Sequence, residues 1–368
     1  MLERTPVGKR YKLRERHSNF PKGSFLWLHG ASLGECKMLA KLLQNLRRDF
    51  PALPKVLLTT EKAEILPLLE TAGFDAVAVA PLDEPRTLEA FFKNSNPKLL
   101  LLAENELWPC TLAAAKKFSV PVALVSGRLR HRPPLLDASP VSFATFQTSH
   151  DLKLFKRWGR NRQKCTPTVG GNWKLLDKNF EAPSEARIEF SAAFASLHFA
   201  EWPSVKNLLE ELCRKNSAPL LAPRRLDELP KFRKALREAR LKTVRYPQVE
   251  SGAVTLIETL GCLPEAMKKA AAVIVGGSFC KRPGIHDFWE PLSLGKKTFV
   301  GPFARGQEFA AASLKKRGAL CALKPFAKEL PELQGGPADI VKFPAEEAAK
   351  VKASYSALRD FLQTRLYK

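Results

Sequence analysis

The order of apolar and polar residues predicts that short strands alternate with amphipathic helices along the first half of the chain. Four consecutive leucines, Leu99 to Leu102, are typical of a central strand in a parallel sheet with both faces covered. The strands expected in this half are 25–28, 55–60, 76–80, 98–102 and 121–125, and the helices are 36–50, 61–72, 87–93 and 111–118. This alternation predicts a doubly wound α/β domain.

A second alternation of the same kind starts near Phe190. The strands expected there are 192–195, 219–222, 242–246, 254–257, 272–275 and 297–300, and the helices are 202–215, 226–240 and 260–269. Two α/β halves with a cleft between them are therefore expected. The expected boundaries are 1–172 for an N-terminal domain, 173–345 for a C-terminal domain and 346–368 for a helical segment that packs back on the first domain.

Length and composition agree with two soluble domains. The chain has 368 residues, of which 45% are hydrophobic and 26% charged. No apolar run approaches the roughly 18–20 residues of a membrane-spanning helix, and the first residues lack the apolar core of a signal peptide. The seven cysteines are scattered without a C-x-x-C pair, so buried free thiols in the cytoplasm are expected.

The net charge of +23 requires an anionic partner. Nucleic acid, an acidic membrane surface or a phosphorylated substrate would each meet this requirement. Residues 1–23 are especially basic, with Arg4, Lys9, Arg10, Lys12, Arg14, Arg16 and Lys22 against Glu3 and Glu15. This segment is interpreted either as a solvated tail or as a contact to phosphate headgroups.

The first stretch with candidate chemistry runs from Phe25 to Glu35 and is predicted to form a strand, a tight loop and a helix start. Gly30 and Gly34 permit a sharp turn, and Glu35 falls in the first helical turn, where the helix dipole favours an ionised carboxylate. Glu35 is thus either a charged base at the mouth of a loop or a residue that only stabilises the helix. The same stretch matches G-x-S-x-G, in which Ser32 would be a hydrolase nucleophile.

A second acidic stretch follows the leucine-rich strand, with Glu104 and Glu106 two residues apart ahead of Trp108-Pro109. In a doubly wound sheet, ligands bind outside the carboxyl ends of the strands. Both acidic stretches follow strands at that edge. The loop that carries Glu104 and Glu106 is therefore predicted to face a ligand.

In the second half of the chain, candidate phosphate-binding residues come directly after expected strands. The glycines of Gly276-Gly277-Ser278 would let backbone amides approach a phosphate, and the segment from Gly284 to Pro291 leads into a short helix. Arg224, after the strand 219–222, is suited to supply a bidentate guanidinium to the same phosphate.

Metal binding is not expected. His286 with Glu290, and His198 with Glu201, have possible ligand spacing, but neither pair has a third ligand nearby. The chain also lacks a D-x-D pair of the kind that holds a divalent ion against a diphosphate. No metal and no cofactor are predicted.

The motifs together resemble the 3-deoxy-D-manno-octulosonic acid (Kdo) transferases of lipopolysaccharide synthesis. The matching stretches, in family order, are Trp27 to Glu35, Glu104 to Pro109, Gly171 to Lys174, Ser196 to His198, Pro223-Arg224, Gly276 to Ser278, Gly284 to Pro291 and Phe299 to Pro302. The resemblance implies a GT-B fold, in which two Rossmann-like doubly wound domains face a central cleft. It also implies CMP-Kdo as donor, a lipid A precursor as acceptor, and no nucleic acid partner.

The resemblance implies roles for particular residues. Glu35 matches the general base of the family, and Glu104 matches a second acidic residue needed at the acceptor side. The donor-binding residues implied are Pro223, Arg224, Gly276, Gly277, Ser278, His286, Asp287 and Glu290, and the acceptor-side residues are Ser32, Gly34, Glu106 and Arg128. The family pattern is changed at Arg225, Cys262, Ile285, Asp287, Phe288 and Trp289.

The N-terminal membrane anchor of many family members is also missing from the pattern. The resemblance then implies that the basic first segment and the surplus charge hold the protein peripherally at the cytoplasmic face of the inner membrane.

Two other functions remain open from the sequence. One is an α/β-hydrolase-type serine esterase that uses Ser32, although no oxyanion motif is evident. The other is a non-catalytic protein that binds anionic lipid, which explains the charge but gives the glutamates at the strand ends no role.

Overall fold

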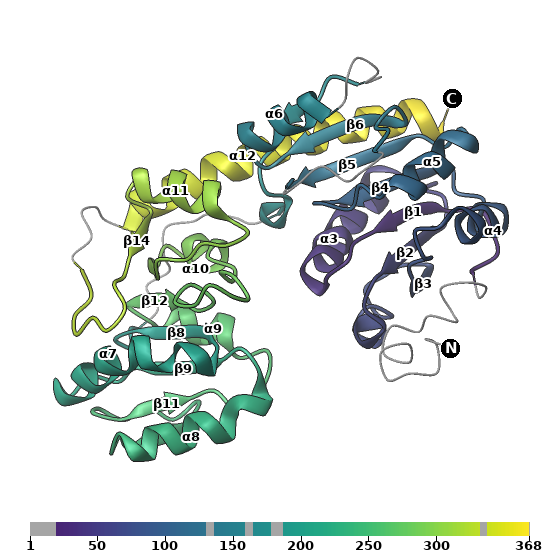
Figure 1. Ribbon diagram of the computed structural model, residues 1–368. Coiled ribbons are helices and arrows are strands. Elements are labelled where there is room, and N and C mark those ends of the chain that lie inside the picture. The colour runs from purple at the N-terminus through teal and green to yellow at the C-terminus, as the bar shows by residue number, and fades with distance from the viewer. Residues whose placement is uncertain (1–19, 130–135, 159–164, 178–186, 332–336, 368) are drawn as a thin grey trace. The chain divides into compact units, whose positions relative to one another are not determined.

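The computed structural model of the protein describes residues 20–129, 136–158, 165–177, 187–331 and 337–367 (Figure 1). The chain divides into two compact units. Unit 1 comprises Met1–Asp177 and Glu347–Lys368, and unit 2 comprises Lys178–Glu346. The division falls at 177/178, five residues beyond the boundary of 172/173 expected from the sequence.

Unit 1 contains a seven-stranded sheet in the order β3-β2-β1-β4-β5-β6-β7, and every paired strand in it is parallel. The strands are β1 (Leu26–His29), β2 (Val56–Thr60), β3 (Ala76–Val79), β4 (Leu99–Ala103), β5 (Val122–Gly127), β6 (Val141–Phe146) and β7 (Thr168–Val169). Every residue of β1, β2, β4 and β5 is buried, which accounts for their nearly continuous apolar sequences.

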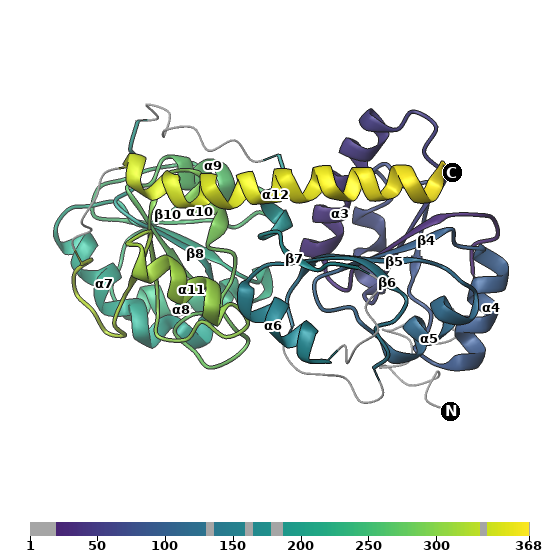
Figure 2. The same cartoon turned by 90° about the horizontal axis from the view of Figure 1, so that it is seen from above.

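The helices of unit 1 cover both faces of this sheet. They are α3 (Leu33–Asp49), α4 (Pro85–Ser95), α5 (Pro109–Lys117), α6 (Ser149–Trp158) and two 3₁₀ helices, η2 (Ala63–Leu68) and η3 (Trp173–Leu175). Figure 2 shows α3 on one face and α4, α5 and α6 on the other. On the face of α4, the ring of Trp27 packs 4.4 Å from Phe91 and 5.7 Å from Phe92, measured between ring centroids.

Unit 2 contains a second seven-stranded parallel sheet, in the order β10-β11-β9-β8-β12-β13-β14. The strands are β8 (Ala193–Leu197), β9 (Leu220–Pro223), β10 (Thr243–Arg245), β11 (Val254–Leu256), β12 (Ala272–Val275), β13 (Lys297–Val300) and β14 (Leu320–Ala322). The helices are η4 (Phe199–Glu201), α7 (Trp202–Arg214), η5 (Leu226–Glu228), α8 (Leu229–Glu238), α9 (Leu263–Lys268), α10 (Trp289–Ser293) and α11 (Glu308–Lys316).

Helices α7 and α8 lie together on one face of this sheet and α9 on the other (Figure 2). Phe232 of α8 is fully buried and meets Phe199 edge to face, with ring centroids 5.3 Å apart. Trp202 of α7 approaches the same ring at 6.4 Å. The α7–α8 face is therefore closed by an aromatic cluster.

The chain ends in one helix of 30 residues, α12 (Pro337–Leu366), whose residues from Glu347 onward belong to unit 1. In unit 1 the hydroxyl of Tyr355 donates to the Asp49 carboxylate at 2.7 Å, and the ring of Phe361 packs 5.4 Å from that of Phe143. Gly170 lies against the same helix, since a Cβ atom there would come within 2.4 Å of the Ser354 hydroxyl. The C-terminal segment thus completes unit 1.

Some expected elements differ from those observed. Residues 61–72 were expected to form a helix, but only the 3₁₀ helix η2 and turns form there, with Pro67 inside η2. Proline removes an amide donor and disfavours the helical conformation of the residue before it. The strands β6, β7 and β14, the helices α6 and α11 and the 3₁₀ helices η3 and η4 were not expected, and the residues around β6 had been interpreted as a connector.

Each sheet changes winding direction beside its first strand. In unit 1 the change lies between β1 and β4, and in unit 2 it lies between β8 and β12. At such a switch point the loops after neighbouring strands diverge, which leaves a crevice outside the carboxyl ends of the strands. The loops after β1, β4, β8 and β12 are therefore the places where the fold favours a ligand.

Other expectations concern the surface of the chain. Within the described ranges, no helix combines the length and apolarity needed to cross a membrane. Most of the basic first segment, residues 1–19, lies outside the described residues. All seven cysteines are free, but only Cys36 is buried and the other six are partly exposed, so the expectation of buried thiols is wrong for those six.

Candidate functional site

Glu35 is fixed at the start of α3 by a reciprocal capping interaction. The Glu35 Oε2 atom accepts from the Ala31 amide at 2.7 Å, and Oε1 accepts from the Ser32 hydroxyl at 2.9 Å. The Glu35 amide in turn donates to the Ser32 hydroxyl oxygen at 3.4 Å. Gly30 is needed at this turn because a Cβ atom there would lie 3.0 Å from Cβ of Glu35.

Glu104 follows β4 on the other side of the switch point and is 1% exposed. Its backbone adopts a φ of 51°, a left-handed conformation that costs free energy in residues other than glycine. The carboxylate forms two ion pairs, with Arg128 Nη2 at 2.9 Å and with Lys174 Nζ at 2.8 Å. A buried charge of this kind is tolerated only when it is paired.

Lys174 connects the two carboxylates. It lies in η3, where the Asn172 side chain accepts from its amide at 3.1 Å, and its side chain passes close to Gly34. Its ammonium group pairs with Glu104 and also acts electrostatically on Glu35. The sequence motif contained Lys174, but no role was assigned to it.

Glu106 and His29 form a buried pair beside Glu35. His29 Nε2 lies 3.3 Å from Glu106 Oε2, and His29 Nδ1 lies 2.8 Å from the Thr59 hydroxyl. The same Glu106 oxygen accepts from the Trp108 indole at 2.7 Å. Burial lowers the pKa of His29, but the hydrogen bond and the charge of Glu106 outweigh it and raise this pKa above its ordinary value.

The environment of Glu35 raises the pKa of its carboxyl group. Burial is the largest cause, followed by the charges of Glu104 and Glu106, while the Ser32 hydrogen bond and Lys174 act in the opposite direction. From the sequence alone, the helix start was expected to keep Glu35 ionised. The capping interaction is present, but burial among carboxylates outweighs it, so Glu35 holds its proton more tightly than an ordinary glutamate.

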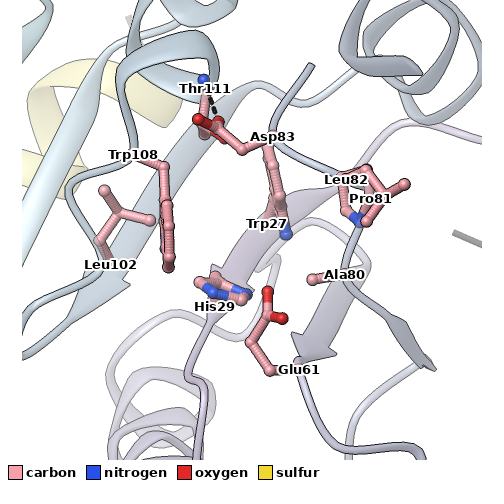
Figure 3. Close-up of a pocket in the computed structure, with 10 residues that line it drawn as sticks. All are labelled: Trp27, His29, Glu61, Ala80, Pro81, Leu82, Asp83, Leu102, Trp108 and Thr111. Atoms are coloured by element: carbon pink, nitrogen blue, oxygen red, sulfur yellow. Dashed lines mark hydrogen bonds between the residues drawn. The ribbon is translucent and has the colours of Figure 1, made fainter. Parts of the chain in front are cut away.

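A pocket of about 210 Å³ opens beside this group. Figure 3 shows His29 and Glu61 at its floor, with the indole of Trp108 standing next to His29. The remaining lining residues are Trp27, Ala80, Pro81, Leu82, Asp83, Leu102 and Thr111. Trp108 is 43% exposed, and its indole orientation is fixed by Glu106. An exposed aromatic face beside carboxylates is suited to an uncharged polar ring.

In unit 2, a carboxylate occupies the glycine loop that was expected to bind phosphate. Glu201 is fully buried, and it accepts from the amides of Gly277 at 2.8 Å, Phe279 at 2.9 Å and His198 at 2.9 Å. The Gly277 amide is therefore not open to a phosphate, contrary to the sequence-based interpretation. The spacing of Glu201 gave no sign of this role.

Ser278 and the two glycines also serve the packing of this loop. The Ser278 hydroxyl is fully buried, donates to the Val275 carbonyl at 2.5 Å and accepts from the Gly301 amide at 2.8 Å. A Cβ atom on Gly276 would come within 2.3 Å of the Ser196 carbonyl oxygen, and one on Gly277 within 2.1 Å of the Gly284 carbonyl oxygen. The loop requires glycines because backbone approaches backbone.

The groups left open at this edge are a guanidinium and two imidazoles. The exposed side chain of Arg224, which follows β9 and Pro223, has no hydrogen-bond or ion-pair partner in the part of the chain that the structure describes. His198 Nε2 lies 2.8 Å from His286 Nε2. Burial, the charge of Arg224 and His198 lower the pKa of His286 to about 3. His286 is therefore neutral.

Asp287 and Glu290 lie at the start of α10. The exposed Asp287 side chain accepts from the Trp289 amide at 2.9 Å, one residue ahead of Phe288, which is the N-cap residue of this helix. Glu290 is partly exposed in its first turn. The helix has only five residues.

The structure thus gathers the predicted residues within each unit. Ser32, Gly34, Glu35, Glu104, Glu106 and Arg128 lie around the unit 1 switch point, and Pro223, Arg224, Gly276, Gly277, Ser278, His286, Asp287 and Glu290 lie around that of unit 2. In the described ranges, no group of three histidine, cysteine or acidic residues is arranged to hold a metal. Four further residues take part in these two arrangements, although the sequence assigned them no catalytic or ligand-binding role: His29, Lys174, His198 and Glu201.

The Ser32 hydroxyl is not arranged as a hydrolase nucleophile. It hydrogen-bonds to Glu35, and among the described residues no histidine contacts it. The nitrogens of His29 are directed to Thr59 and Glu106 instead. A serine nucleophile needs a base within hydrogen-bond reach, commonly a histidine.

Residues 6–174 match the family model described as 3-deoxy-D-manno-octulosonic-acid transferase (kdotransferase). A 3-deoxy-D-manno-octulosonic acid transferase of Aquifex aeolicus is 28% identical over 360 residues, which cover 94% of this chain and 97% of the relative. One of Chlamydia trachomatis serovar D is 24% identical over 327 residues, which cover 81% and 74%.

The crystal structure of Acinetobacter baumannii MurG has a TM-score of 0.52 to this chain at 11% identity, and the match covers 94% of this chain and all of the MurG chain. At this identity the likeness shows the fold alone. The prediction of the GT-B class, built from two Rossmann-like units, is confirmed.

Replacing Glu201 tests whether its carboxylate holds the glycine loop. Glu201→Ala leaves three amide donors without their acceptor, and each buried unsatisfied donor costs about 1–3 kcal/mol. The free energy of unfolding should fall by roughly 3 kcal/mol or more, measured by denaturant titration. Glu201→Gln, which keeps one oxygen, should lose less. The control Glu238→Ala, at an exposed position, should change little; equal stability of Glu201→Ala and this control would contradict the role.

Proposed function

Since this chain is a relative of the Kdo transferases and a glycosyltransferase, as its motifs predicted, we propose that it transfers Kdo from CMP-Kdo to a lipid A precursor. The observation that carries the proposal is the buried group of Glu35, Glu104 and Glu106 at the switch point of unit 1. This group offers a carboxylate with a raised pKa beside a pocket suited to a sugar. Such a carboxylate is matched to general base catalysis near neutral pH.

In the proposed reaction, a glucosamine hydroxyl of the acceptor attacks the anomeric carbon of Kdo. Glu35 accepts the hydroxyl proton as the bond from that carbon to the CMP phosphate breaks, and one displacement gives inversion. The acceptor sugar rests against Trp108 in the pocket beside His29. Glu104 holds Lys174 and Arg128 next to the base, and Lys174 limits how far the pKa of Glu35 rises.

The donor binds at the switch point of unit 2 in this proposal. The open guanidinium of Arg224 contacts the phosphate, and His286 lies beside it. Asp287 and Glu290 lie at the start of α10, where they would face the ribose hydroxyls, with Pro223 shaping the other side. Gly276, Gly277 and Ser278 set the shape of the loop instead of donating to the phosphate.

The acceptor carries acyl chains, so the enzyme works at a membrane surface in this proposal. The net charge of +23 would attract the chain to anionic lipids on the cytoplasmic face of the inner membrane. Attraction of this kind weakens as salt screens it. Turnover of CMP-Kdo with a tetra-acylated lipid A precursor, followed by mass spectrometry, tests the substrate pair directly.

Replacing the base tests the role of Glu35. Glu35→Gln keeps the size of the side chain but removes the proton acceptor, so transfer should fall by about 10²-fold or more. Binding of CMP, measured by calorimetry, should be unchanged. Glu70→Gln, at an exposed position of unit 1, is the control. Near-normal turnover of Glu35→Gln would show that another group takes the proton.

The pH dependence of transfer tests the charges around Glu35. Its base form exists only above its raised pKa, so kcat/KM should rise with pH through that value. Lys174→Met removes a positive charge that lowers this pKa, so the rising limb should move to higher pH. Lys41→Met, an exposed position of α3, should leave the limb in place. If the rising limb of the Lys174→Met profile lies at the same pH as that of the wild type, Lys174 does not lower the pKa of Glu35.

Substitutions of the adjacent residues Arg224 and Arg225 distinguish a direct contact with the nucleotide from a general effect of positive charge. Arg224 has an open guanidinium, whereas Arg225 pairs with Asp227 at 2.5 Å. Arg224→Ala should weaken CMP binding by roughly 10-fold or more, since hydrogen bonds to charged groups contribute about 1.5–3 kcal/mol. Arg225→Ala removes the same charge one residue away and should have little effect. Equal losses in the two variants, measured by calorimetry, would indicate a diffuse electrostatic effect.

A further inference from the structure

Two histidine rings meet end to end at the switch point of unit 2. The Nε2 atoms of His198 and His286 are 2.8 Å apart, while the ring centroids are 4.9 Å apart. The rings therefore join through their Nε2 atoms. A hydrogen bond of this geometry needs one ring to donate from Nε2 and the other to accept there.

The surrounding charges decide which ring donates. Glu228 Oε2 lies 3.9 Å from His198 Nδ1, so a carboxylate faces the ring nitrogen of His198 that points away from His286. Arg224 acts on His286 and disfavours a positive charge there. His286 is thus the neutral acceptor, whose own proton resides on Nδ1, and His198 donates from Nε2 in the form that carries a proton on each nitrogen. In the portion of the chain that is described, His286 Nδ1 has no hydrogen-bond partner.

We propose that His198 and His286 form a relay that protonates the phosphate oxygen of the departing nucleotide. The inference rests on the proposed function. As the bond between the sugar carbon and the phosphate oxygen breaks, its electron pair stays on that oxygen. His198 enters the step with a proton on each ring nitrogen. His286 gives its Nδ1 proton to this oxygen and receives the Nε2 proton of His198, which is left as a neutral ring with its proton on Nδ1, the nitrogen nearest Glu228. The proton taken from the acceptor hydroxyl by Glu35 and the one given to the phosphate balance, and solvent restores both groups.

A relay explains features that packing alone does not require. Both histidines are only partly buried, at the same edge as the open guanidinium of Arg224. The charged groups near the pair in the described chain include Arg224, Glu228, Glu201 and Asp287. In the relay Arg224 neutralises the phosphate, while Glu228 lies beside the distal ring, that of His198. Here His286 is the proton donor and His198 is a positioning residue that acts through it.

The test uses the full chain and measures kcat against pH together with CMP affinity. His198→Gln removes the distal proton but keeps a hydrogen-bonding side chain, so kcat should fall by about 10²-fold and its high-pH limb should flatten. His286→Gln should have a similar effect, and Glu228→Gln a smaller one. CMP affinity of His198→Gln, by calorimetry, should stay within about 3-fold of the wild type. His150→Gln, in α6 of unit 1, is the control.

The outcomes separate the relay from the proposed function. Loss of kcat with a flattened limb and intact CMP binding supports the relay. An unchanged kcat, or a loss of kcat with the wild-type pH profile, overturns the relay but leaves the donor site in place if CMP still binds. If the wild type binds no CMP, the proposed function fails, and the relay fails with it.

Discussion

A carboxylate buried where a parallel strand ends is the constraint on which both units depend. Removal of such a group from water costs several kcal/mol unless partners replace the lost hydration. Glu104 after β4 and Glu201 after β8 meet this cost in different ways. Glu104 is paired with two cations, whereas Glu201 accepts from three backbone amides. In each case the carboxylate fixes the loops around the switch point.

The difference in partners separates structural carboxylates from a reactive one. Both oxygens of Glu201 accept from amides of its own unit and the side chain is fully buried, so this group organises a loop and does not face a ligand. Glu35 accepts only from its own turn, and no cation pairs with it among the described residues. Burial, followed by the charges of Glu104 and Glu106, raises its pKa. A group that is fixed in place but incompletely neutralised is suited to accept a proton.

The sequence predicted most of this fold because its strands are buried on both faces. Runs such as Leu99–Ala103 have no exposed side, so their apolar composition identifies them without any periodicity. β6 was missed because Ser142 and Phe143 are only partly buried and its pattern is weak. Positions after strands predicted Glu35, Glu104 and Arg224 because topology places all such loops at one edge.

The partners of these side chains could not be predicted in the same way. Glu201 and Gly277 are 76 residues apart, and Lys174 reaches Glu104 across 70 residues of sequence. Such pairs depend on how loops fold back over the sheet, which local sequence does not encode. The glycine loop was interpreted as a phosphate site for this reason. The glycines do allow another group to approach the backbone of this loop closely, as their pattern predicted. The group that accepts from the loop amides is, however, a carboxylate of the same unit.

The departures from the family pattern at 285–289 are explained by where these side chains lie. Ile285, Phe288 and Trp289 are buried, so their added volume enters the interior of unit 2 and not the edge that carries Arg224. The backbone that presents His286 is held independently, because its amide donates to the Gly276 carbonyl at 3.1 Å. Asp287, which replaces an asparagine of the family pattern, accepts from the Trp289 amide, a hydrogen bond that the side-chain oxygen of either residue can accept. The buried changes at 285, 288 and 289 therefore affect the packing beneath the loop and not the side chains at the edge that carries Arg224.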